Sequence, residues 1–406
     1  MIFYIDMETS KRDQYLSRFI LSYFMVSALN ATIKTIFSIP EVAWKTISLI
    51  GGCFVLFYFV HSIKYILKFS GKLLFISYLG ILLNVVVSIF INSTISFEGT
   101  MFWMVFICVP MGLALFSLNN IQELYDALLK CSYLLFVILS LNVIFSVQEK
   151  SYNMFLSYAL AFPLLIHINE CFKKFRLWHF MIIICELLVI VLFGSRGALL
   201  SVAFFCFYSI LLRFNFTVKS CAWIFISCLL CILLFINMST IGSWVIAKLS
   251  EYDIYSRTLV LLFSSDIGDL SGRDDIWNEC LYLISQRPIL GWGFNGWQER
   301  LVMYSGMDSS VGVYPHNIFL ELCLDYGIIV GGMFSIILSL SFFQYINLRD
   351  KIERELWGIL FALGMLPLII SDTYKSSVIF FLYIYFFMFT LKNKVVIKPS
   401  CLQFSK

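Results

Sequence analysis

The sequence predicts an all-α fold, a polytopic membrane bundle of about 12 transmembrane helices with one large loop outside the cytoplasm. Of its 406 residues, 60% are hydrophobic and only 13% are charged, with a mean hydropathy of +0.89. Soluble domains carry about 25% charged residues. Apolar runs close to the roughly 20 residues that cross a bilayer recur along the chain, and one long polar stretch, residues 240–315, interrupts them.

The predicted spans follow one another with short polar connections. In order they are 16–38, 44–61, 72–92, 101–117, 128–148, 152–169, 177–194, 197–213, 220–239, 316–346, 356–371 and 376–391. The N-terminal segment is too polar and too acidic for a cleavable signal peptide, so the first span is expected to serve as the insertion signal. The predicted organisation is a bundle of about nine spans over 1–239, the large loop with short helices over 240–315, and C-terminal spans with a cytoplasmic tail over 316–406.

Positive charges orient the bundle, because short cytoplasmic loops collect Lys and Arg. They gather before the first span, in every second connection after it and in the tail: Lys11, Arg12, Arg18, Lys64, Lys68, Lys72, Lys173, Lys174, Arg176, Arg213, Lys219, Arg349, Lys351, Arg354, Lys392, Lys394 and Lys398. Both termini are therefore expected in the cytoplasm, and the large loop outside it. The net charge of +4 reflects this bias and does not indicate nucleic acid.

Within the large loop, "SGRDDIWNECLYLISQRP" predicts a short helix. Ser271 is placed to cap it, and acidic residues occupy its first turn. Apolar residues recur on one face, at Ile276, Cys280, Leu283 and Ile284. This helix is expected to lie on the bundle or at the membrane surface.

The stretch "LGWGFNGW", residues 290–297, has the G-x-G-x-x-G spacing of dinucleotide-binding loops. That fingerprint requires a preceding strand and an acidic residue about 20 positions on. No such strand is expected in this loop, and position 316 is a histidine. The glycines instead predict a turn, with Trp292 and Trp297 beside the membrane interface.

Four histidines are candidates for acid–base chemistry. His61, His167 and His179 fall at cytoplasmic ends of predicted spans, where an interfacial role is expected. His316 opens the long C-terminal apolar run at the external membrane boundary. A histidine pKa near 6.5 makes a neutral base available there, although a lone histidine at a boundary can equally be structural.

Two arginines are placed for anion binding. Arg196 lies between two glycines in a turn on the same external side as the large loop, where it either reaches lipid headgroups or awaits an anion. Arg273 opens the predicted loop helix and either pairs with Asp274 or Asp275 or binds an anion. Together with His316 they predict a site for a lipid-linked phosphate, which the arginine fork suits, with backbone donors added by the helix N-terminus.

Three stretches, "GSRGALLS", "SGRDDIW…RPILGWG" and "YPHNIFLELCLDYGIIVGG", resemble the O-antigen ligase/polymerase family over about residues 190–335. The resemblance implies a GT-C-like, metal-independent glycosyltransferase of lipopolysaccharide biosynthesis that needs no cofactor. Its implied partners are undecaprenyl-diphosphate-linked glycan donor and acceptor, the membrane and a chain-length regulator. Its implied location is the bacterial inner membrane, with the active site on the periplasmic side. Arg196 and Arg273 match the family's arginines, and His316 matches its histidine.

The resemblance also implies roles. His316 would take a proton from an acceptor hydroxyl, and the two arginines would stabilise charge on the departing diphosphate. Arg257, part of an R-x10-G pattern, is expected to bind substrate with Asn317 and Glu321. For Glu321 and Asp325, orienting the histidine, binding sugar and lying in a solvated groove all remain open.

The leading hypothesis is an O-antigen polymerase, which transfers the growing glycan from undecaprenyl diphosphate to a fresh lipid-linked repeat unit. The alternative within the family is a ligase, which transfers the polymer to lipid A–core. Val330, where family ligases often carry a polar residue, and the loop "RPILGWGFNGW" favour the polymerase. A lipid-glycan transporter is the alternative from another class, but the expected internal repeat is not visible.

Two further features lie inside predicted spans. Glu186 carries a charge that is costly in a membrane and is therefore protonated, paired or functional. Gly327 and Gly331 form a G-x-x-x-G pattern that predicts close helix packing.

Overall fold

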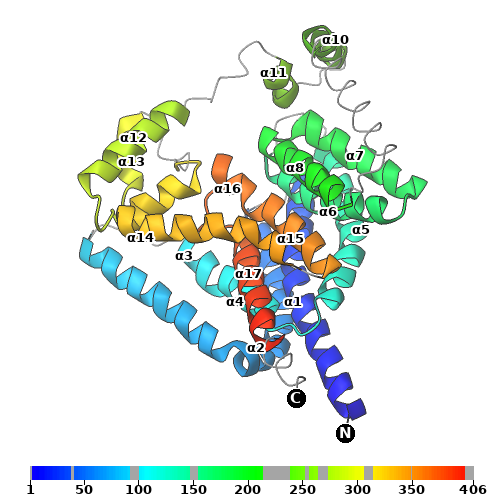
Figure 1. Ribbon diagram of the computed structural model, residues 1–406. Coiled ribbons are helices and arrows are strands. Elements are labelled where there is room, and N and C mark those ends of the chain that lie inside the picture. Colours follow the sequence, from blue (N-terminus) through cyan, green and yellow to red (C-terminus); the bar gives the residue numbers. More distant parts are fainter. Residues whose placement is uncertain are drawn as a thin grey trace, which may run out of the picture. The chain divides into compact units, whose positions relative to one another are not determined.

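The structure is a computed structural model, and every regular element in its described residues is helical (Figure 1). The described residues are 2–37, 41–91, 100–146, 154–213, 238–251, 256–263, 273–305, 314–348 and 350–397. The chain forms two compact units. Unit 1 contains Met1–Phe24, Gly52–Ala127 and Leu270–Lys406, and unit 2 contains Met25–Gly51 and Leu128–Asp269.

The prediction of an all-helical membrane protein is confirmed. In the described part of the chain, six helical stretches are long and apolar enough to cross a membrane: Ser10–Phe37, Trp44–Ile91, Ile121–Phe145, Met154–Lys173, Arg196–Arg213 and Ile318–Asn347. Three shorter apolar stretches accompany them, Met101–Phe116, Leu177–Phe193 and Val378–Asn393. The predicted span 220–239 lies almost entirely outside the described residues. The count of about twelve spans remains a prediction.

Helices α1 (Ile2–Phe37) and α2 (Glu41–Ile91) contain the first three predicted spans. The second and third are not separated by a loop, because α2 continues through them with a kink at Ser70. The Ser70 hydroxyl donates to the Ile66 carbonyl at 2.9 Å, a bond back to the preceding turn that often bends helices.

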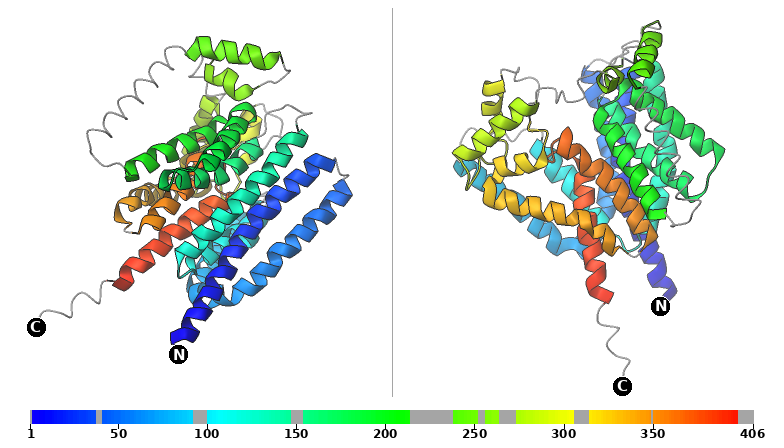
Figure 2. Two further views of the ribbon diagram at one scale, coloured as in Figure 1. Left: turned by 90° about the vertical axis from the view of Figure 1, so that its right-hand side faces the viewer. Right: turned by 45° about the horizontal axis from the view of Figure 1, so that its top comes forward.

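Unit 2 is built around α6 (Met154–Lys173), which packs against α7 (Leu177–Phe193) and α8 (Arg196–Arg213) (Figures 1 and 2). Its other described elements include most of α5, together with α10 and α11, with bounds Ile121–Ser146, Met238–Ser250 and Arg257–Phe263.

A buried polar pair in unit 2 accounts for the charge predicted inside a span. The two carboxyl oxygens of Glu186 lie 3.0 and 3.1 Å from His167 Nδ1, and His167 Nε2 lies 3.1 Å from the Ser132 hydroxyl. Glu186 is therefore paired. His167 and His179 are both buried, so the interfacial role predicted for these two histidines is wrong.

In unit 1, α17 (Val378–Ile397) packs against α4 (Val109–Phe116) and α15 (Lys351–Gly364) (Figures 1 and 2). Its remaining short elements are α3, η1, α13, η2 and α16, with bounds Thr100–Trp103, Met104–Cys108, Gln298–Ser305, Phe343–Asn347 and Leu366–Ile370. The loop helix predicted from the sequence is α12 (Arg273–Gln286). All four residues of its predicted apolar face are buried, while the predicted cap at Ser271 lies outside the described residues.

Helix α14 (Ile318–Phe342) corresponds to one predicted span but consists of two halves. At Gly327 the backbone leaves helical geometry, with φ 76° and ψ 173°. A Cβ on Gly331 would lie 2.5 Å from the Leu322 carbonyl oxygen, so the half after the kink folds back against the half before it. The G-x-x-x-G pattern therefore serves packing within α14.

Candidate active site

The G-x-G-x-x-G stretch is a turn that packs against α14 at its kink. Gly291 and Gly293 adopt positive φ values of 66° and 76°, a region that glycine enters without strain. The amides of Trp292 and Gly293 donate to the carbonyls of Leu324 and Asp325 at 2.7 and 3.1 Å. A Cβ on Gly291 would lie 2.6 Å from the Gly327 amide nitrogen. The predicted turn is confirmed.

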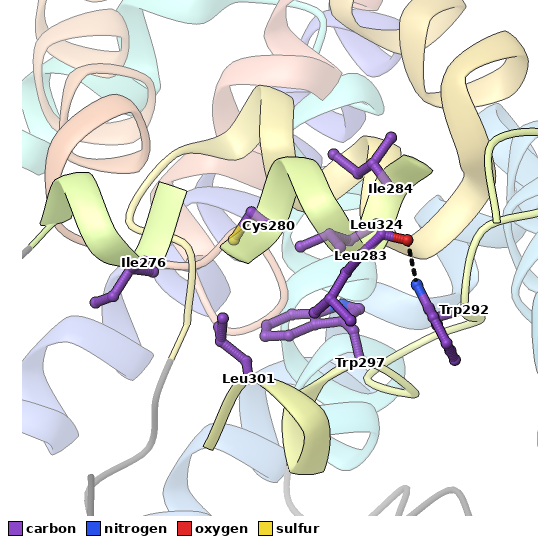
Figure 3. Close-up of a cluster of buried hydrophobic side chains, with 8 residues drawn as sticks. All are labelled: Ile276, Cys280, Leu283, Ile284, Trp292, Trp297, Leu301 and Leu324. Atoms are coloured by element: carbon purple, nitrogen blue, oxygen red, sulfur yellow. Dashed lines mark hydrogen bonds between the residues drawn. The ribbon is translucent and has the colours of Figure 1, made fainter. Parts of the chain in front are cut away.

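Both tryptophans of this turn are buried in an apolar cluster (Figure 3). The cluster joins α12, the turn, α13 and α14 through Ile276, Cys280, Leu283, Ile284, Trp292, Trp297, Leu301 and Leu324. The Trp292 indole donates to the Leu283 carbonyl at 2.8 Å, and the guanidinium groups of Arg287 and Arg300 each lie 4.2 Å from its ring centroid. Protein covers both side chains, and their position near the membrane interface remains a prediction.

A buried charge cluster lies directly beside this turn. The ammonium group of Lys375, a residue that is 1% exposed, contacts Asp325 Oδ2 at 2.8 Å, Glu321 Oε1 at 3.3 Å and Asn295 Oδ1 at 2.7 Å. Asp325 also accepts from the Trp297 indole and the Tyr374 hydroxyl, at 2.8 and 2.7 Å. Each charge thus has partners, which a buried ion requires.

His316 stands at the entrance to α14 with an unusual backbone φ of 52°. Its ring centroid lies 4.1 Å from that of Tyr314, and its Nδ1 is buried with no hydrogen-bond partner among the described residues. Burial, and next the positive charge of Arg273, lower the pKa of His316 to about 4, against the opposing effect of a hydrogen bond to the Ser371 backbone. The imidazole is therefore neutral at neutral pH, and no described group occupies its Nδ1.

Arg273 approaches His316 because α12 begins beside the segment that precedes α14. The Trp277 indole, one turn into α12, donates to the Pro315 carbonyl at 2.9 Å. The structure thus brings two of the three predicted catalytic residues together, with the N-terminal end of a helix at the same place. A cation beside a neutral imidazole is an arrangement suited to an anionic substrate that must lose a proton nearby.

Arg196, the third predicted catalytic residue, belongs to unit 2 and is the first residue of α8. The Ser195 hydroxyl caps this helix by accepting from the Ala198 amide at 3.2 Å, and the Ser195 amide donates to the Ser157 hydroxyl at 3.2 Å. A Cβ on Gly194 would lie 2.3 Å from the Ile190 carbonyl oxygen. The turn before Arg196 is therefore tightly fixed, and the arginine itself is half-buried.

The predicted substrate-binding residues have different surroundings. Asn317 caps α14, its side-chain oxygen accepting from the amides of Phe319 and Leu320 at 3.0 and 3.3 Å. Glu321 and Asp325 are buried in the charge cluster, so a solvated groove position for them is wrong. Arg257 is the first residue of α11, and its side chain and Gly268 lie outside the described residues.

The sequence analysis missed the segment Ser371–Lys375, which supplies three partners of the α14 carboxylates. Thr373 donates to Glu321 at 2.6 Å, Tyr374 donates to Asp325, and Lys375 contacts both. A polar run, "SDTYKSS", between two strongly apolar stretches was the available indication.

Helices that can span a membrane, and a half-buried histidine on which the charge of a half-buried arginine acts, define an integral membrane protein with a candidate transfer site. Residues 179–335 match the family model described as O-antigen ligase, and this match supports the O-antigen ligase/polymerase family. The match points to a glycosyltransferase-like enzyme and to lipid-linked glycan substrates in a membrane. No curated protein and no solved structure matches the chain.

Proposed function

We propose that this protein is an O-antigen polymerase of the bacterial inner membrane. It transfers the growing glycan from undecaprenyl diphosphate to the terminal hydroxyl of a fresh lipid-linked repeat unit. The observation that carries the proposal is the neutral imidazole of His316, whose buried Nδ1 has no hydrogen-bond partner among the described residues, beside the charge of Arg273 within the matched family region.

In the proposed reaction, His316 Nδ1 accepts the proton of the acceptor hydroxyl as that oxygen attacks the anomeric carbon of the donor. The bond between this carbon and the diphosphate oxygen breaks, and undecaprenyl diphosphate departs with the electron pair. General base catalysis of this kind contributes about 10²–10⁴ in rate.

Arg273 and Arg196 are proposed to bind the diphosphate and stabilise the charge that grows on its leaving oxygen. Arginine remains cationic at every relevant pH and forms paired hydrogen bonds to phosphate oxygens. This electrostatic role makes a metal ion unnecessary. Asn317, Glu321 and Arg257 are proposed to support the acceptor or donor glycan from the same side of the membrane.

The proposed topology has about twelve spans in a GT-C-like bundle, with both termini in the cytoplasm and His316 on the periplasmic side. A chain-length regulator is proposed as a protein partner. Ligation of finished polymer to lipid A–core is the second candidate activity, because the matched family model is described as O-antigen ligase. Val330 and the turn "RPILGWGFNGW" favour polymerisation.

Lipopolysaccharide from a strain lacking the gene separates the candidates. Wild-type protein and His316→Ala are returned on plasmids, and the banding patterns are compared. Core carrying one repeat unit in the deletion strain supports the polymerase. Core without O-antigen, with polymer held on the lipid carrier, supports the ligase. A full ladder restored by His316→Ala contradicts the role of His316 as the base.

A further inference from the structure

Two arginines outside the proposed transfer site share one buried indole. The guanidinium carbons of Arg287 and Arg300 each lie 4.2 Å from the ring centroid of Trp292, so they are no more than twice that distance apart. Contact with an aromatic face attracts a guanidinium without neutralising its charge. Among the described residues, neither arginine forms an ion pair with a carboxylate. The pair is therefore a local concentration of positive charge.

Both guanidinium groups remain able to bind a ligand. Arg287 is half-buried and Arg300 is exposed. A guanidinium has five N–H donors, and Arg287 uses Nη1 to donate to the Ile91 carbonyl at 3.2 Å, which leaves most of its donors for a ligand. Arginine forks bind phosphate oxygens through paired hydrogen bonds. Two of them this close together suit a phosphate or diphosphate group.

The arginine pair lies beside exposed apolar side chains at the end of a predicted span. Ile91 is the last residue of α2, and Phe90 is 87% exposed. Ile289 and Leu290 open the glycine turn (residues 288–297) directly after Arg287 and are 65% and 64% exposed. Figure 1 shows the end of α2 beside this part of unit 1. An anion attached to a long apolar chain can place its charge at the arginines and its chain along this surface.

The arginine pair is also separate from the proposed base. Arg273 is the first residue of α12, whereas Arg287 directly follows the last one, Gln286. A helix rises about 1.5 Å per residue, so the two arginine backbones are about 20 Å apart. Helix α12 thus has one cation whose charge acts on His316 and another at its opposite end.

The proposed transfer uses two lipid-linked diphosphates, which must bind at different distances from the base. The donor's diphosphate leaves from the carbon that reacts, so it lies next to His316. The acceptor reacts through its terminal hydroxyl, and its own diphosphate is attached at the other end of the repeat unit. This second diphosphate therefore lies several sugars away from the base. The length of α12 provides a separation of that kind.

We propose that Arg287 and Arg300 bind the diphosphate of the acceptor, with the acceptor's apolar chain along the surface beside them. The assignment to the acceptor rests on the proposed function, whereas binding of a lipid-linked diphosphate does not. The acceptor's diphosphate gains no charge during transfer, so the arginines stabilise the bound substrate and the transition state equally. Binding of this uniform kind lowers KM and leaves kcat unchanged.

The binding test uses full-length protein in phosphatidylcholine nanodiscs, with radiolabelled undecaprenyl diphosphate as the probe. Arg287→Gln/Arg300→Gln removes both charges and is expected to weaken binding at one site by roughly 10- to 100-fold, the value of hydrogen bonds to charged groups. Binding at the donor site shows that this variant is folded. Arg287→Lys/Arg300→Lys keeps both charges and is expected to recover part of the affinity. Lys351→Gln, which removes an exposed charge on α15, is the matched control.

Transfer is measured in parallel, with lipid-linked polymer as donor and single lipid-linked repeat units as acceptor. In Arg287→Gln/Arg300→Gln, KM for the acceptor is expected to rise by the same factor while kcat is unchanged. Arg273→Gln is expected to lower kcat instead, because its charge acts on the departing diphosphate. The two ends of α12 are thereby distinguished in one assay.

Unchanged lipid binding in Arg287→Gln/Arg300→Gln, or an unchanged KM for the acceptor, overturns the proposal. Equal competition by phosphatidylglycerol also overturns it, because the site would then bind anionic lipids of any kind. Loss of the lipid site in this variant, in a protein that forms no polymer even as wild type, would uphold binding by these arginines and reject the polymerase function.

Discussion

The two halves of α14 differ in which kind of side chain they bury. The half before Gly327 carries Glu321 and Asp325 on a buried face, each with hydrogen-bond donors from other segments. The half after it exposes large apolar side chains, among them Ile329 and Met333 at 61% and 60%. Within a membrane, a charged side chain is stable only where the protein surrounds it and supplies hydrogen-bond or ion-pair partners, whereas apolar side chains can face lipid directly. The comparison separates a part of the helix built for a site from a part built for the membrane.

The largest expected effect is at the entrance to the first half. His316→Gln removes the proposed base while it keeps a polar side chain of similar size, so polymerisation is expected to fall by about 10²–10⁴-fold. Ile329→Ala, in the second half, serves as the matched control and is expected to retain activity. Incorporation of repeat units into long glycan by purified protein in nanodiscs measures both. Equal activity of the two variants would contradict the proposal that only the first half of α14 belongs to the site.

The next effect concerns stability. Asp325→Ala leaves Lys375 without its nearest carboxylate and the Trp297 and Tyr374 donors without their acceptor. Breaking a buried ion pair costs about 3–5 kcal/mol. Met333→Ala in the second half is expected to cost less than about 1 kcal/mol, because its side chain is largely exposed. Reversible denaturation in mixed micelles compares them, and a similar loss for both contradicts the proposed difference.

A smaller effect on stability is expected at Gly327, the residue between the two halves, and Gly332 serves as its control. Gly327→Ala forces a side chain into a positive-φ position and places its Cβ 2.2 Å from the Ile289 carbonyl oxygen. Backbone strain of this kind costs about 1–3 kcal/mol before the steric contact is relieved. Gly332→Ala meets no atom within 4 Å in the described structure and is expected to stabilise the helix by up to about 1 kcal/mol. Thermal unfolding of the two variants should shift in opposite directions.

The sequence predicted best what depends on local pattern. The apolar face of α12 followed from its helical spacing, and the turn at Gly291 and Gly293 followed from the glycines themselves. The bend in α14 was not predicted, because the residues around Gly327 read as one continuous apolar run. It depends on the turn at Pro288–Gly291, which is distant in the sequence and packs against it.

The site was predicted only in part for the same reason. His316 and Arg273 were identified by residue type and by their positions beside apolar stretches, and the structure places Arg273 where its charge acts on His316. Lys375 was missed because a lysine in a short connection is ordinarily solvated. Its function as a buried counter-ion appears only when α14, the glycine turn and the segment before α17 are brought together.

The smallest expected effect tests the electrostatic link between α12 and the first half of α14. Burial is the main cause that lowers the pKa of His316 to about 4, and the positive charge of Arg273 is the second cause. Arg273→Gln removes that charge and should raise the pKa of His316. When the solution is acidified, the imidazole of this variant therefore becomes protonated at a higher pH than in the wild type. The acidic limb of the activity profile is then expected to move to higher pH, in addition to a lower rate at every pH. Titration of the His316 ¹⁵N resonances in nanodiscs measures the shift directly, with Arg300→Gln on α13 as the control. An unchanged His316 pKa in Arg273→Gln would show that burial alone keeps the base neutral, and that the arginine acts only on the anionic substrate.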